Sequence, residues 1–157
     1  MDIIGKTTIN PILFFSGKVF GYLTWIALLL LFFNIEVVNS ISFYYNNYIS
    51  FIILAIGLAF SIISIVNLGS STRLGLPIDD TIFKTNGLYK ISRNPMYLGF
   101  NLLTISSMIY TLNIIIVVLG IYSITIYHMI ILVEERYLES RFGNEYLNYK
   151  QKTKRYF

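Results

Sequence analysis

One long uncharged run constrains this chain more than any other feature. No Asp, Glu, Lys or Arg occurs between Tyr97 and Val133, and that stretch is too long for a single bilayer crossing, which takes about 20 residues. A polar break at 111–113 divides the run and predicts two helices joined by a tight turn near the far membrane face. Two further apolar segments precede it. The sequence therefore predicts an all-α, integral membrane helical bundle of about four transmembrane helices that ends in a helical hairpin. The predicted spans are residues 19–35, 48–68, 96–111 and 114–133.

The positions of the basic residues predict how this bundle is oriented. Charged residues make up 13% of the chain, about half the share in a soluble domain. All 12 lysines and arginines flank the apolar segments, and the loops at 36–47 and 111–113 contain none. The positive-inside rule then places both termini and the 69–96 loop in the cytoplasm. The net charge of +4 is explained by membrane topology, and we expect no nucleic-acid partner.

Composition excludes several kinds of site. The chain has no cysteine and one histidine, so we expect no disulfide and no metal site. Its length fits a single domain, residues 1–157. The residues after the first span, Glu36 to Asn39, lack the small-residue pattern of a signal-peptide cleavage site, which favours a retained helix. In the second span Gly57, Ser61 and Ser64 form a small-residue stripe that predicts a helix-packing face.

The segment at 69–96 carries part of the polar chemistry. Asn94 followed by Pro95 predicts a helix start, with Asn as N-cap and Pro at the first helical position. A helix N-terminus beside Arg93 attracts anions such as a carboxylate or a phosphate. The same residues also fit ordinary capping plus a positive-inside arginine. The residues alone leave both interpretations open.

The segment at 134–157 carries the rest. Glu134 and Glu135 stand together where the fourth span ends, as a site for a cationic ligand or as a solvated helix end. His128 lies seven residues before Glu135 and shares its helix face, as a packing residue or as a ligand. Gly143 predicts a helix C-cap, and Asn144 predicts the cap of a second, short cytoplasmic helix.

Taken together, these segments resemble the isoprenylcysteine carboxyl methyltransferase and phospholipid methyltransferase superfamily. The pattern there is G-x-Y-x-x-x-R-[HN]-P-x-Y-x-G entering a helical hairpin, then a His, an E-E pair, L-x-x-x-F-G-x-x-Y-x-x-Y and a final arginine. Two departures are Asn94, where many relatives have His, and Leu88, where Pro is frequent. The matching residues are Gly87, Tyr89, Arg93, Asn94, Pro95, Tyr97, Gly99, His128, Glu134, Glu135, Leu138, Phe142, Gly143, Tyr146, Tyr149 and Arg155.

The resemblance implies a methyltransferase that uses S-adenosyl-L-methionine, releases S-adenosyl-L-homocysteine and acts on a lipophilic acceptor at the cytoplasmic membrane face. The cofactor would lie between segments 69–96 and 134–157 and the hairpin helices. Implied catalytic residues are Arg73, Arg155 and Glu134. Implied cofactor-binding residues are Tyr89, Arg93, Asn94, Pro95, Tyr97, Leu98, Gly99, His128, Glu134 and Glu135.

Several alternatives stay open at this stage. A carboxylate acceptor, as in a prenylcysteine, needs a cation such as Arg73 or Arg155 to orient it, whereas a lipid amine needs a base such as Glu134. A related group of membrane steroid reductases uses NAD(P)H and shares a similar R-H-P-x-Y element, but Met96 and Phe100 stand where that group tends to have Asn and Glu. The last alternative is a small non-enzymatic membrane interaction protein.

Overall fold

The computed structural model describes residues 7–41, 44–69 and 83–157, and all regular structure in these ranges is helical. Arg73, one of the residues implied as catalytic, lies outside the described residues. The all-helical bundle is confirmed. Its elements are α1 (Pro11–Phe32), α2 (Tyr44–Leu68), a 3-10 turn η2 (Gly87–Lys90), α3 (Pro95–Thr111), α4 (Ile114–Phe142) and α5 (Asn144–Lys152).

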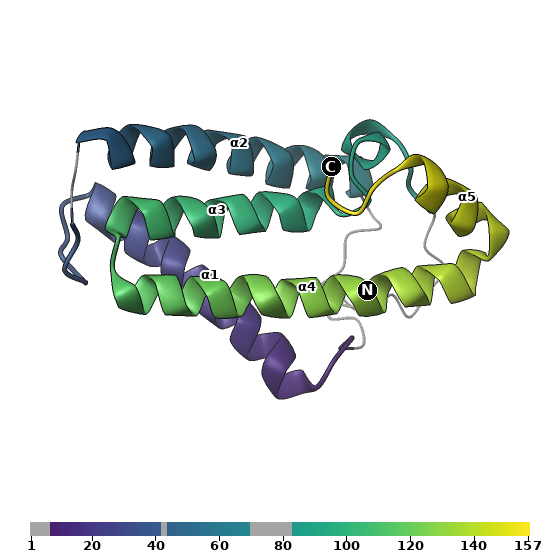
Figure 1. Cartoon of the computed structure of the whole chain (residues 1–157), viewed down its shortest axis with the longest axis horizontal. Helices are drawn as coiled ribbons and strands as arrows, with labels where there is room; N and C mark the ends of the chain where they lie inside the picture. The colour runs from purple at the N-terminus through teal and green to yellow at the C-terminus, as the bar shows by residue number, and fades with distance from the viewer. Residues whose placement is uncertain (1–6, 42–43, 70–82) are drawn as a thin grey trace.

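Helices α3 and α4 form the predicted hairpin, and their turn has clear local causes. Leu112 adopts a left-handed conformation with φ of 44°, which ends α3. The Asn113 side chain then accepts hydrogen bonds from the N–H groups of Ile115 and Ile116 and starts α4. Figure 1 shows the two helices antiparallel, with α2 beside α3 and α1 crossing behind them. The break at 111–113 is therefore confirmed as the hairpin turn.

Helices α2 and α3 approach each other through the predicted small-residue stripe. A Cβ atom added at Gly99 would lie 2.7 Å from the Ser61 N atom and 2.9 Å from the Gly57 carbonyl oxygen. Both neighbours are backbone atoms, so they cannot turn aside as a side-chain end can. The packing role expected for Gly57 and Ser61 is confirmed.

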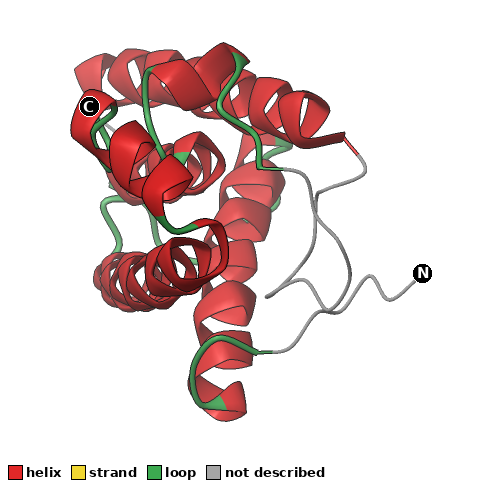
Figure 2. Ribbon diagram, turned by 90° about the vertical axis from the view of Figure 1, so that its right-hand side faces the viewer, coloured by secondary structure: helices red, strands yellow, loops and turns green. Residues whose placement is uncertain are grey.

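Helices α1 and α4 form a second close pair. A Cβ atom at Gly17 would lie 2.3 Å from Ile126 Cγ2, and one at Gly21 would lie 2.6 Å from Ser123 Oγ. Figure 2 shows α1 turned away from the other long helices at its N-terminal end. The bundle thus consists of two tightly packed helix pairs, α2 with α3 and α1 with α4.

The apolar exterior of the bundle fits a bilayer. Among the described helices, α1, α2 and α4 are long and apolar enough to cross a membrane. Helix α3 has 17 residues, about 25 Å at 1.5 Å per residue, slightly less than a hydrocarbon core of about 30 Å. Buried hydroxyl groups inside the bundle hydrogen-bond carbonyls one turn back, as Ser107 does to Leu103 and Thr111 does to Ser107. The chain is therefore a membrane protein, and hydroxyl groups such as those of Ser107 and Thr111 are satisfied within its own helices.

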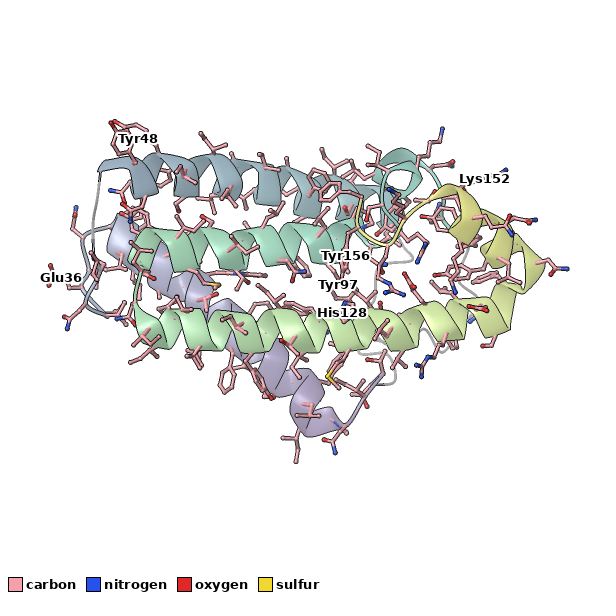
Figure 3. All side chains as sticks on the ribbon, viewed as in Figure 1. Glu36, Tyr48, Tyr97, His128, Lys152 and Tyr156 are labelled. Atoms are coloured by element: carbon pink, nitrogen blue, oxygen red, sulfur yellow. The ribbon has the colours of Figure 1, made fainter. Side chains whose placement is uncertain are left out.

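The orientation of the termini is a testable prediction. Glu36 and Lys152 lie at opposite ends of the bundle, as Figure 3 shows, and basic residues gather at the Lys152 end. In this cysteine-free chain, we expect Glu36→Cys to react with an impermeant thiol reagent only from outside intact cells, and Lys152→Cys only after permeabilisation. Reaction of both from the same side would contradict cytoplasmic termini.

Candidate active site

Two arginines converge on Glu135 at the predicted cytoplasmic end of the bundle. Arg93, from the loop before α3, donates through Nε to Glu135 Oε1 and through Nη2 to Oε2, both at 3.1 Å. Arg155, near the end of the chain, donates to Oε2 through Nε at 3.2 Å and Nη2 at 3.0 Å. We call Arg93, Glu135 and Arg155 the ion cluster. Because it combines two cations with one carboxylate, it carries a net positive charge.

The ion cluster is buried on one side and open on the other. The side chains of Arg93 and Glu135 are 8% and 5% exposed, whereas that of Arg155 is 34% exposed. Hydrogen bonding to Glu135 raises the pKa of the Arg155 guanidinium above its usual range, so Arg155 stays charged. An anion from solvent can therefore reach Arg155 more easily than Arg93.

Asn94 occupies the position expected for it but uses its side chain differently. It is the N-cap residue of α3 and Pro95 follows as the first helical residue, as predicted. Its side chain makes no capping hydrogen bond to the helix. Instead, Asn94 Nδ2 donates to Glu135 Oε1 at 2.9 Å. The Asn94 amide thus ties the start of α3 to the ion cluster on α4.

The tail after α5 is held along the start of α3. Ser92 and Lys154 form a parallel β-bridge, and the Arg93 N–H donates to the Lys154 carbonyl at 2.9 Å. Arg93 Nη1 also donates to the Thr153 carbonyl at 2.7 Å. Gly143 ends α4 as predicted and also serves as the N-cap of α5, so Asn144 is the first residue of α5 rather than its cap. The turn at Gly143 reverses the chain, which lets α5 and the tail carry Arg155 back to Glu135.

Glu134 has a different environment from its neighbour. The Tyr97 hydroxyl donates to Glu134 Oε1 at 2.8 Å. Lys18 of α1 acts electrostatically on the same carboxylate, and its ammonium lies 3.9 Å from the centre of the Phe14 ring. Glu135 forms ion pairs with two arginines, whereas the hydrogen-bond partner of Glu134 is a neutral hydroxyl. Of the two carboxylates, Glu134 is therefore the better placed to exchange a proton.

The remaining predicted site residues lie either next to the C-terminal segment or in contacts between helices. His128 Nδ1 and the Tyr156 hydroxyl lie 2.6 Å apart, and Figure 3 shows both, with Tyr97, between α3 and α4. Tyr89 is buried, and the Tyr149 hydroxyl of α5 donates to its carbonyl. Burial raises the pKa of the Tyr89 phenol above its usual range. Leu98 is buried in α3, and Gly99 lies against α2.

Three residues near the site have roles that the sequence reasoning did not assign. Lys18 counted only as a positive-inside residue, although it acts on Glu134. Tyr156 pairs with His128, and no spacing rule links positions so far apart. Asn101, one turn after Tyr97, has a buried Oδ1 without a hydrogen-bond partner. The sequence feature that could have identified Asn101 is its polar amide, which lies inside an otherwise apolar span.

Comparison with protein families decides between the enzyme classes considered above. A family model described as phospholipid methyltransferase matches residues 45–145. The chain belongs to the phospholipid methyltransferase family. The matched region runs from α2 to the start of α5 and includes Arg93, Tyr97, Glu134 and Glu135. Membership in this methyltransferase family favours a membrane methyltransferase over the reductase alternative. No curated protein and no solved structure gave a significant match.

Proposed function

We propose that this protein transfers a methyl group from S-adenosyl-L-methionine to a lipophilic acceptor at the cytoplasmic face of the membrane. The observation that carries the proposal is the family match over residues 45–145, which includes Arg93 and Glu135 of the ion cluster as well as Glu134, at one end of an otherwise apolar bundle. A reacting centre at that boundary serves a substrate whose tail is dissolved in the bilayer and whose head group reaches water.

The residues around the ion cluster fit this cofactor. Its methionine carboxylate suits Arg155, which is partly exposed in a cluster of net positive charge, and the positive end of α3 lies beside it. Its amino and hydroxyl groups suit the unpaired Asn101 Oδ1 and the polar pair of His128 and Tyr156. When bound, the cofactor supplies an electrophilic methyl group on a sulfonium.

The environment of Glu134 favours an amine as the acceptor. An ammonium head group must lose a proton before its nitrogen can attack the methyl group, and Glu134 is the carboxylate that no arginine pair neutralises. Tyr97 orients that carboxylate through its hydroxyl hydrogen bond. A carboxylate acceptor would instead require orientation by Arg155, so Arg155→Ala would then reduce turnover strongly even at saturating cofactor.

The purified protein is expected to bind S-adenosyl-L-homocysteine with a dissociation constant in the micromolar range, which corresponds to a binding free energy of about −8 kcal/mol. With methyl-labelled cofactor, it should transfer label into an organic-extractable product from a membrane lipid extract or a prenylcysteine analogue. Calorimetry measures the first result, and scintillation counting of the extracted phase measures the second.

A parallel titration with NADPH serves as the control for the nucleotide-like part of the cofactor. Binding of NADPH without S-adenosyl-L-homocysteine would contradict the proposal in favour of a reductase. Cofactor binding without labelled product across the acceptor panel would contradict the assigned acceptor class.

A further inference from the structure

Lys18 is a basic residue beside the contact between α1 and α4. Its neighbour Gly17 lies against Ile126, and Gly21, one turn later, lies against Ser123. These two contacts fix the helices in an antiparallel register. Moving toward the N-terminus of α1 therefore means moving toward the end of α4 where the polar residues gather.

The Lys18 side chain extends toward that end of α4. Its ammonium lies 3.9 Å from the centre of the ring of Phe14, which is one turn closer to the N-terminus. Phe14 is buried in a hydrophobic cluster that also contains Ile130 and Tyr97. Glu134 follows Ile130 by four residues, so it lies on the same face of α4, about 6 Å further along the axis. The contacts thus bring the ammonium toward the Glu134 carboxylate, and the two groups attract each other electrostatically.

Other titratable groups surround Glu134 on the neighbouring elements. The Tyr97 hydroxyl donates to it at 2.8 Å, and the adjacent Glu135 is paired with the two arginines of the ion cluster. Helix α2 contributes no charged residue. The remaining groups in this region are Tyr89 of η2, His128 of α4, Tyr146 and Tyr149 of α5 and Tyr156 of the C-terminal segment. Among the described residues, the arginines therefore offset the charge of Glu135, and Lys18 is the cation that can offset the charge of Glu134.

We propose that Lys18 is a positioning residue for methyl transfer, because its ammonium holds Glu134 in the carboxylate form. The proposal rests on the proposed function, in which Glu134 accepts a proton from the ammonium head group of the acceptor. That step moves one proton from the nitrogen to a Glu134 oxygen and leaves a neutral amine and a neutral carboxyl group. Since apolar surroundings favour the neutral form of a carboxyl group, a nearby cation is needed to keep Glu134 ionised before the step. Lys18 lies outside residues 45–145, so this role is independent of the residues in the family match.

The ionisation of Glu134 can be measured without turnover. Infrared spectra of the protein in phosphatidylcholine nanodiscs are recorded over a pH series, and the C=O band of the protonated Glu134 is identified as the one missing from Glu134→Gln. We expect Lys18→Met to raise the midpoint of this titration by about one pH unit, a tenfold change in proton affinity, because the carboxylate loses its cation. Lys18→Arg keeps the charge and should stay near the parental midpoint. The matched control is Lys150→Met, which removes a lysine paired with Glu139 and should leave the midpoint unchanged.

An unchanged midpoint in Lys18→Met, or an equal shift in Lys18→Met and Lys150→Met, would overturn the proposal. With labelled cofactor, the pH–rate profile of Lys18→Met should move in the same direction as the infrared titration. Its rate should be about tenfold lower at pH values below the parental midpoint and should approach the parental rate at higher pH. A uniform loss at every pH would indicate a structural role and would overturn the proposal as well. The expected infrared shifts in a protein that transfers no label would count against the proposed function and not against the pairing of Lys18 with Glu134.

Discussion

Replacement of Glu135 by Gln is expected to lower the free energy of unfolding by about 3 kcal/mol or more, because Arg93 would remain buried without a countercharge. The loss falls toward the low end of the range for buried pairs, since Arg155 is a third exposed and water can screen it. Thermal unfolding in detergent micelles, followed by circular dichroism, measures the change. The affinity for S-adenosyl-L-homocysteine should also fall, by roughly 1.5–3 kcal/mol, as Arg155 loses its position.

The matched control is Glu139→Gln on the same helix. Glu139 pairs with Lys150 at 3.0 Å, but both side chains are 40% exposed, so its loss should change stability by less than about 1 kcal/mol. Equal unfolding temperatures for Glu135→Gln, Glu139→Gln and the parent would show that the ion cluster does not stabilise the fold.

A double variant separates stability from binding. Arg93→Met combined with Glu135→Met replaces the buried pair by apolar side chains of similar length, a change that is often neutral for stability. We expect it to recover most of the unfolding free energy but not the affinity for S-adenosyl-L-homocysteine. Recovery of both the stability and the affinity would show that the ion cluster is not part of the cofactor site.

The second large effect is expected at Glu134. If this carboxylate accepts the proton of an amine acceptor, Glu134→Gln should lower the rate of methyl transfer by about 10²–10⁴-fold at saturating cofactor. The dissociation constant of S-adenosyl-L-homocysteine should change little, because the proposed site binds that ligand through Arg155 and the start of α3. Single-turnover kinetics with labelled cofactor and calorimetry give the two values separately.

Tyr97→Phe provides the graded comparison. It removes the hydroxyl that orients Glu134 but leaves the carboxylate in place, so a smaller decrease in rate is expected than in Glu134→Gln. Parental rates in Glu134→Gln would contradict its role as a base. A large decrease in the rate of Arg155→Ala at saturating cofactor, with Glu134→Gln unaffected, would identify a carboxylate acceptor instead.

Much of the fold could be predicted because the bilayer limits the choices. The uncharged run with its polar break predicted the α3–α4 hairpin, and the Asn94-Pro95 pair predicted where α3 begins. Small residues at Gly57 and Ser61 predicted a close packing face on α2, and the structure shows that α3 is the helix packed there. Each of these signals is local in sequence, and each has a direct physical cause in lipid.

The arrangement within the candidate site was harder to predict. The sequence predicted that Arg93, Asn94 and Glu135 would gather at one membrane face, but not that Asn94 would donate to Glu135 instead of capping α3. That choice depends on how α4 sits against the start of α3. The contribution of Lys18 was missed for a similar reason, since it depends on how α1 packs against α4.

The glycine contacts also determine how the bundle can move. Backbone atoms of α2 block any closer approach at Gly99, and Ile126 blocks it at Gly17, so neither helix pair can be compressed. An apolar cavity of about 660 Å³, lined by residues such as Trp25 of α1 and Leu58 of α2, lies along the boundary between these two pairs. A change in the width of this cavity therefore requires a shift of one pair against the other and not closer packing within a pair.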